Sequence, residues 1–225
     1  MRNLYFLFFL LLLAVQMSQA QQKQALPNAK TIPAVSLFAS CDYFSPGFGD
    51  VDAAFRTIEK NYVLPSGSNF KDYYNVLAGI RFTPVPQQSV QLELGGSAFR
   101  SATSGSLGGN RTASFIQMGY LGATYLVNLP VGPVNCFIGA GLGWVWLSAQ
   151  RSYSTQSGIA RLNAGLTQAH GLGGIEYVDP TGVTFAVDAG YSFATTLFPK
   201  RADLNFTLKG ITGGIKIGVP LVKVL

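Results

Sequence analysis

Residues 183–194 read Val-Thr-Phe-Ala-Val-Asp-Ala-Gly-Tyr-Ser-Phe-Ala, the cleanest alternation of side chains in the chain. The odd positions, beginning with Val183 and Phe185, are apolar or aromatic, whereas the even positions are small or polar and include Asp188. Successive side chains of a β-strand point to opposite faces, so this stretch predicts a strand with one apolar face and one polar face.

The same alternation recurs along the chain. It predicts strands over residues 34–45, 72–83, 89–100, 112–128, 134–148, 161–178, 183–194 and 204–219. Short turns at 84–88, 129–133 and 179–182 alternate with long polar segments at 46–71, 101–111, 149–160 and 197–203. This rhythm is typical of outer-membrane β-barrels, whose periplasmic turns are short and whose outer loops are long. We therefore predict an all-β fold, an eight-stranded antiparallel up-and-down transmembrane β-barrel with both termini in the periplasm.

Two segments depart from simple alternation. In the first outer loop, apolar residues recur at helical spacing behind Asp50, which predicts a short amphipathic helix. Its apolar residues are Val51, Ala54, Phe55 and Ile58. The helix is interpreted as a lid, as a helix on the lipid surface, or as a loop that packs its own apolar residues. In the last strand the apolar parity changes between Leu208 and Ile211, which predicts a β-bulge near Lys209 and Gly210.

The N-terminus predicts export. Arg2 precedes an unbroken apolar run from Leu4 to Val15, and Ser18 and Ala20 form a small-x-small cleavage site. This run is shorter than the roughly 20 residues of a spanning helix, and no later stretch is long and apolar enough to be one. We expect a signal peptide at 1–20, a periplasmic lead-in at 21–33 and an outer-membrane β-barrel domain at 34–225. The localisation is then the outer membrane of a Gram-negative bacterium, reached after signal-peptide removal.

Composition decides which face of the barrel meets its surroundings. The chain is 48% hydrophobic and only 12% charged, whereas soluble domains carry about 25% charged residues. A soluble carrier such as a lipocalin would need charges on the non-core face, but here that face is mostly Gly, Ser, Thr and Ala. Small residues suit the crowded interior of an eight-stranded barrel.

Two sets of site residues follow from this orientation. The few charges on the small-residue face are expected to form a lumen polar network that leaves a poor or absent pore; they are Arg81, Glu93, Glu176, Asp188 and Lys216. Aromatic residues near strand ends are expected to lie at the membrane interfaces; they are Tyr43, Tyr74, Tyr125, Trp144, Trp146, Tyr177 and Phe193.

Several features together carry a family resemblance: the signal peptide, eight strands, proline-bearing inner turns, and segments such as Gly139-Ala-Gly-Leu-Gly-Trp144 and Gly190-Tyr-Ser-Phe193. They resemble the small outer-membrane β-barrel domain family of OmpA/OmpX type, over nearly the whole chain after residue 20. The resemblance implies a monomer inserted by the outer-membrane assembly machinery, with adhesion, structural or small-solute roles among relatives. Such barrels usually end on an aromatic residue, whereas this chain has Pro220 and ends on Leu225.

No residue pattern indicates catalysis. His170 is the only histidine and lies mid-strand, with no serine at an evident nucleophile spacing. Metal binding would need more His, Cys or clustered carboxylates than the chain has, so we expect neither a metal nor another cofactor. The net charge of +6 comes from scattered basic residues, which favours contact with outer-membrane lipids and lipopolysaccharide over nucleic acid.

The leading functional hypothesis is a structural or surface-interaction protein of the outer membrane, not an enzyme. An extracellular ligand would bind through the outer loops, with residues 46–71 as the main contact surface. A narrow passive, porin-like pore for small solutes, an enzyme that modifies lipid A and a soluble lipid-carrying barrel are the alternatives.

Overall fold

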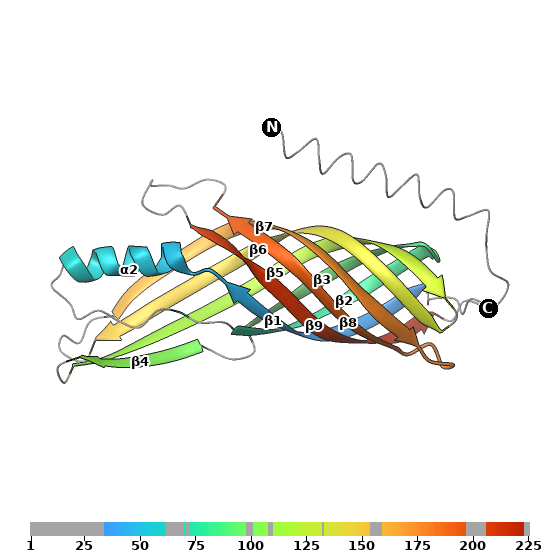
Figure 1. The fold of residues 1–225 in the computed structure, drawn as a ribbon, viewed down its shortest axis with the longest axis horizontal. Coiled ribbons are helices and arrows are strands. Elements are labelled where there is room, and N and C mark those ends of the chain that lie inside the picture. The colour runs from blue at the N-terminus through green and yellow to red at the C-terminus, as the bar shows by residue number, and fades with distance from the viewer. Residues whose placement is uncertain are drawn as a thin grey trace, which may run out of the picture.

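The computed structural model describes residues 34–61, 70, 73–97, 101–107, 110–131, 133–153, 159–196 and 206–222 (Figure 1). The predicted signal peptide and lead-in, and the loop at 197–203, lie outside the described residues. The elements are β1 (Val35–Pro46), α2 (Gly49–Asn61), β2 (Tyr73–Val85), β3 (Gln88–Ser97), β4 (Ser101–Leu107), β5 (Asn110–Val131), β6 (Val134–Tyr153), β7 (Ile159–Val178), β8 (Thr184–Thr195) and β9 (Thr207–Val222). None of the helices in the described part of the chain is long and apolar enough to cross a membrane.

The strands close into a ring. They are ordered β3-β2-β1-β9-β8-β7-β6-β5-β4, and an additional pairing of β3 with β5 completes an eight-stranded antiparallel barrel. The predicted fold class is thereby confirmed. β3 pairs with the inner part of β5 and β4 with its outer part, so β4 continues the position of β3. The prediction of a loop at 101–111 is therefore wrong, because residues 101–107 pair as β4 with the start of β5, which begins at Asn110.

Other connections are also tighter than predicted. β6 continues to Tyr153 and β7 begins at Ile159, inside the segment predicted as a polar loop. β2 reaches Val85 opposite Gln88, with a register irregularity after Phe82 that accommodates Pro84. β5 and β6 pair out to Val131 and Val134. Two-residue connections suffice between antiparallel strands, so the ladders continue into the predicted turns.

The turn at 179–182 is confirmed. Asp179 accepts hydrogen bonds from the backbone N–H groups of Thr181 and Val183 and from the Thr181 hydroxyl. Gly182 has a φ of 90°, a conformation that residues with a side chain rarely adopt. The side chain of Asp179 thus organises the turn, and Gly182 permits its backbone path.

The predicted bulge in the last strand is absent. β9 pairs with β8 without a register shift from Thr207 to Gly218, and its shift lies instead against β1, between Val35 and Ser36, where Pro220 pairs with Ser36. The parity change has a different cause: Leu208 is fully buried inside the barrel, whereas Ile211 is 65% exposed on its outer face.

The barrel has two levels of opposite polarity. We call the end of the barrel at the short turns the inner level and the end at α2 the outer level. In the inner level the side chains that point away from the lumen are apolar and exposed, among them Leu37, Leu94, Leu142, Ile138, Ile175, Val187 and Ile215. In the outer level a large apolar cluster fills much of the interior around the buried Arg151, and most of the outward side chains are polar, among them Gln117, Ser148, Asn163 and Lys209. On β6 the change falls between Trp146 and Ser148. The inner level therefore has the surface that a hydrocarbon layer requires, and the outer level has the surface of a water-soluble barrel.

Helix α2 belongs to the outer level. Its existence is confirmed, and Figure 1 places it at the end of the barrel where β5 and β6 run furthest. Val51 and Phe55 are fully buried in one cluster with Ile116, Leu147, Leu166 and Leu208 from the strands and with Phe206, which directly precedes β9. Full burial of each such side chain stabilises by about 1.5–3 kcal/mol. The apolar face of α2 thus packs against the barrel interior, as expected of a lid.

Candidate functional site

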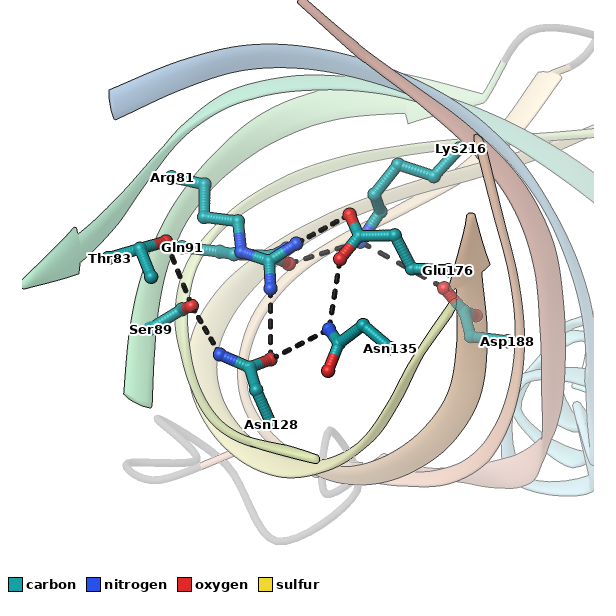
Figure 2. Close-up of polar contacts among 9 residues, drawn as sticks. All are labelled: Arg81, Thr83, Ser89, Gln91, Asn128, Asn135, Glu176, Asp188 and Lys216. Atoms are coloured by element: carbon teal, nitrogen blue, oxygen red, sulfur yellow. Dashed lines mark hydrogen bonds and ion pairs between the residues drawn. The ribbon is translucent and has the colours of Figure 1, made fainter. Parts of the chain in front are cut away.

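The inner part of the lumen is filled by a hydrogen-bonded cluster around Arg81 (Figure 2). One guanidinium nitrogen donates to Glu176 Oε1 at 2.7 Å and another to Asn128 Oδ1 at 2.9 Å. Asn135 donates from Nδ2 to Glu176 Oε2 at 3.0 Å and to Asn128 Oδ1 at 3.2 Å. Asn128 Nδ2 in turn donates to Ser89 Oγ at 2.7 Å. Both charges are buried, so their attraction and hydrogen bonds must offset the cost of removing them from water.

A second cluster is built on Lys216 from β9. Its ammonium donates to Gln91 Oε1 at 3.0 Å and lies 3.9 Å from Asp188 Oδ2. The same ammonium is 4.7 Å from the centre of the Phe38 ring, within cation–π range. Lys216 therefore fills the lumen with three partners from three strands, as the dashed contacts to Gln91 and Asp188 in Figure 2 show.

Glu93 forms no ion pair with an arginine or lysine that the structure describes. Its Oε1 accepts the Thr124 hydroxyl at 2.7 Å, and the oxygen of that hydroxyl lies 2.8 Å from His170 Nε2. A hydroxyl has one proton, so when Thr124 donates to Glu93, His170 must donate from Nε2 to Thr124. His170 is then a donor toward the Thr124 hydroxyl, which is the opposite of the role of a general base.

Glycines make this packing possible. Gly139, Gly141 and Gly143 face inward on β6, and a Cβ atom at these positions would collide with the side chains of Leu126, His170 and Tyr120, respectively. The lumen is filled by large side chains from neighbouring strands in the space that these glycines leave. A cavity of about 70 Å³ remains beside Asp42, Glu93, Asp188 and Lys216.

The outer end is held by Arg151, which is fully buried. Its guanidinium donates to Glu59 Oε1 at 2.7 Å, to Ser114 Oγ at 2.8 Å and to Asp52 Oδ1 at 3.4 Å. The same group lies 4.8 Å from the centre of the Phe55 ring. Two carboxylates of α2 are thereby tied to β6.

Asp52 also accepts the backbone N–H of Phe70 at 3.3 Å. Burial raises the pKa of the Asp52 carboxyl above its usual value, although the Phe70 N–H and Arg151 both act to lower it. The loss of hydration is therefore the larger effect at this site.

The five charges predicted to share the lumen are all inward but form separate groups. Arg81 meets Glu176 and Lys216 meets Asp188, whereas Glu93 bonds a threonine. Sequence reasoning missed the neutral residues that complete the groups, Ser89, Gln91, Thr124, Asn128 and Asn135, and it missed Arg151. Inward parity was a usable signal for the neutral residues. Arg151 lay in a segment predicted as a loop, where parity has no meaning.

The seven aromatic residues predicted for the interfaces lie on the outer face. Tyr43 and Tyr74 form a cross-strand pair with ring centres 5.5 Å apart near the outer end of β1 and β2. Trp144, Trp146 and Phe193 also lie toward the outer end, whereas Tyr177 lies beside the turn at 179–182. Tyr125 is the most covered of the set. Their contact with lipid headgroups remains a prediction.

No protein-family model and no curated protein matches the chain. Among solved structures, Neisserial surface protein A matches with a TM-score of 0.53 and 11% identity, over 84% of this chain and 97% of that one. Ail of Yersinia pestis, in complex with the heparin analogue sucrose octasulfate, matches with a TM-score of 0.48 and 13% identity, over 82% and 96%. The N-terminal β-barrel domain of Pseudomonas aeruginosa OprF matches with a TM-score of 0.42 and 12% identity, over 83% and 98%.

The match to Neisserial surface protein A shows a shared fold. Together with the closed ring and the two polarity levels, it shows that the chain has the fold of the eight-stranded outer-membrane β-barrels of OmpA/OmpX type.

Proposed function

We propose that this protein is a non-conducting barrel of the bacterial outer membrane with a structural and surface-interaction role. The observation that carries the proposal is the closed outer end, where α2 packs onto the barrel core and Arg151 binds two of its carboxylates. A lid with a buried ion cluster makes the outer level a rigid body that stands above the membrane, which suits contact with other surfaces.

The lumen supports the absence of conduction. The Arg81 cluster occupies its inner part, and the cavity between this cluster and α2 holds about 70 Å³. Separating Arg81 from Glu176 would leave two buried charges without their partner, which opposes opening of the lumen through this cluster. Because His170 donates a hydrogen bond to Thr124, it gives no support to the alternative of a lipid-modifying enzyme.

Conductance of the purified protein in planar bilayers tests the closed lumen. We expect no stable channels, because both ends of the interior are filled. Reproducible steps of uniform size would contradict the proposal and favour the alternative of a passive pore.

Attachment of bacteria that display the protein tests the surface role. The exposed face of α2 carries Arg56 and Lys60. We expect the double variant Arg56→Glu, Lys60→Glu to attach several-fold less to cultured epithelial cells than wild type, whereas Lys209→Glu, which reverses a charge on the barrel wall, attaches normally. If wild-type display adds nothing to attachment, the surface-interaction role fails.

A further inference from the structure

The outer faces of β5, β6 and β7 form three rows of side chains at the level where polarity changes. Across these strands Gly119, Trp146 and Gly165 pair in one row, and Gln117, Ser148 and Asn163 pair in the next. The third row consists of Phe115, Gln150 and Arg161. Amide, hydroxyl and guanidinium groups, with Phe115 at one edge, thus stand directly above the row that holds Trp146 between two glycines.

This face is hollowed. A groove of about 350 Å³ is lined by the two polar rows and Ile116. A neighbouring hollow of about 500 Å³ is lined by Trp146, Gly119 and Gly165 and shares Gln117, Ser148 and Asn163 with the groove. A Cβ atom on Gly119 would lie 3.3 Å from the Trp146 ring, so the glycine lets the indole lie close to the sheet. The two hollows therefore adjoin, the groove bordered mainly by polar side chains and the second hollow by Trp146 and two glycines.

The polar groups of this site are not used within the described part of the chain. There, the side chains of Gln117, Ser148, Gln150, Arg161 and Asn163 make no hydrogen bond or ion pair. None of the carboxylates that the structure describes lines either hollow. The site therefore presents uncompensated donors and one positive charge, a combination that favours an anionic ligand rich in acceptor oxygens. An indole beside amide groups adds a surface for the apolar face of a sugar ring.

The position of the groove next to the apolar band indicates the source of such a ligand. Directly inward of Trp146 on the same face, Leu121 and Leu142 are 51% and 62% exposed and belong to the apolar band. A molecule with its headgroup in the groove would extend its hydrocarbon over these leucines. We propose that this groove binds the phosphorylated sugar headgroup of a glycolipid of the outer leaflet, with Arg161 on the phosphate. The inference rests on the proposed outer-membrane location and names a partner for it.

Intrinsic fluorescence provides a direct readout, because Trp144 and Trp146 are the only two tryptophans in the chain. We would titrate the Trp144→Phe variant in lipid nanodiscs of phosphatidylcholine with lipid A, a phosphorylated disaccharide lipid. A saturable change in Trp146 emission is expected. Phosphatidylglycerol, which has a phosphate but no sugar, should bind at least 5-fold more weakly.

Two substitutions in the same background locate the site. Arg161→Gln and Asn163→Ala should each weaken lipid A binding by about 5- to 10-fold, because each removes hydrogen bonds to the headgroup. Lys209→Gln is the matched control, since it removes an exposed charge from the outer wall away from the groove. Equal affinities of Arg161→Gln and Lys209→Gln, or equal binding of phosphatidylglycerol and lipid A, would overturn the proposal.

The source of the headgroup and the proposed location are tested separately. If the deacylated phosphorylated disaccharide binds as tightly as lipid A, the ligand is a free glycan and the membrane-lipid assignment is wrong. If the protein fails to insert into bilayers and shows no heat-dependent mobility on denaturing gels, the proposed function itself fails. Insertion without saturable lipid A binding overturns the groove inference alone.

Discussion

Two arginines secure the two ends of the barrel interior by the same chemistry. Arg81 binds Glu176 near the inner turns, and Arg151 binds Glu59 below α2, each at 2.7 Å. Neither arginine stands alone with its carboxylate, because asparagine or serine side chains take further guanidinium protons. A buried charge is tolerated when most of its hydrogen-bonding capacity is used. Arg151 donates from all three guanidinium nitrogens, whereas Arg81 donates from two and its Nε has no hydrogen-bond partner among the described residues.

Substitution of one member of such an ion pair should lower the free energy of unfolding more than substitution of both members. We expect Arg81→Met to lower the free energy of unfolding by about 3–5 kcal/mol, because Glu176 would remain buried without its cation. The double variant Arg81→Met, Glu176→Gln should regain much of that loss. Urea unfolding of the refolded barrel in lipid vesicles, followed by gel mobility, measures both values. A loss below about 1 kcal/mol for Arg81→Met would contradict a structural role for this pair.

Asp52 should make the docking of α2 dependent on pH. Because the folded-state pKa of Asp52 is raised, the folded state binds its proton more tightly than the unfolded state. The contribution of this group is therefore largest below its usual pKa and is lost as pH rises through the raised value. Hydrogen exchange of the α2 amides, corrected for intrinsic rates, should slow on acidification from neutral pH.

Asp52→Asn keeps an acceptor for Phe70 and Arg151 and removes the ionisation. We expect this variant to remain docked at neutral pH and to lose that part of the pH dependence. Asp50→Asn changes an exposed carboxylate of the same helix and should keep the wild-type slope. If Asp50→Asn flattens the profile instead, Asp52 is not the titrating group.

The turn between β7 and β8 shows what one element requires of its residues. Gly182→Ala should lower the free energy of unfolding by about 1–2 kcal/mol, since φ at this position is 90°. Gly171→Ala is the control, because its Cβ would meet nothing closer than a carbonyl oxygen at 3.8 Å. The midpoints of urea unfolding of the refolded variants measure the change in stability at both positions. Equal midpoints would mean that the turn relaxes without strain.

The strands were predictable where lipid and lumen impose opposite polarity on alternate residues. β8 follows this rule along its whole length and was assigned from its alternation. β4 consists of Ser, Ala, Thr, Gly and Leu, and its alternation carries no apolar signal because it lies beside the outer half of β5. The parity change at Leu208 predicts a bulge from the sequence, but it records the passage of β9 from the outer level to the inner one.

The candidate site was predictable only in part for a related reason. Inward parity identified the lumen charges, but their partners depend on the shear of the barrel, which sets which residues of distant strands share a level. Arg81 and Glu176 are 95 positions apart in sequence, and no local pattern joins them. The groove on β5, β6 and β7 also requires the register of three strands.

The whole molecule combines a membrane barrel with a water-facing barrel on one set of strands. Trp146 and Ser148, two positions apart on β6, lie on opposite sides of the boundary between the two levels. Extension of β5, β6 and β7 past the other strands creates the outer level, and α2 completes its core. This arrangement places both the lid and the groove outside the apolar band without a separate domain.

Thiol chemistry can locate the boundary on the intact protein. Cys41 and Cys136 are both free and exposed on the outer face, and Cys41 lies between Val76 and Ile215 in the apolar band. In lipid vesicles a charged, membrane-impermeant maleimide should leave both native thiols unmodified and should label them after denaturation. In a Cys41→Ala, Cys136→Ala background, Ser148→Cys should be labelled in the folded state. Rapid labelling of Cys41 in vesicles would mean that water covers the apolar band, and the barrel would then be a soluble carrier.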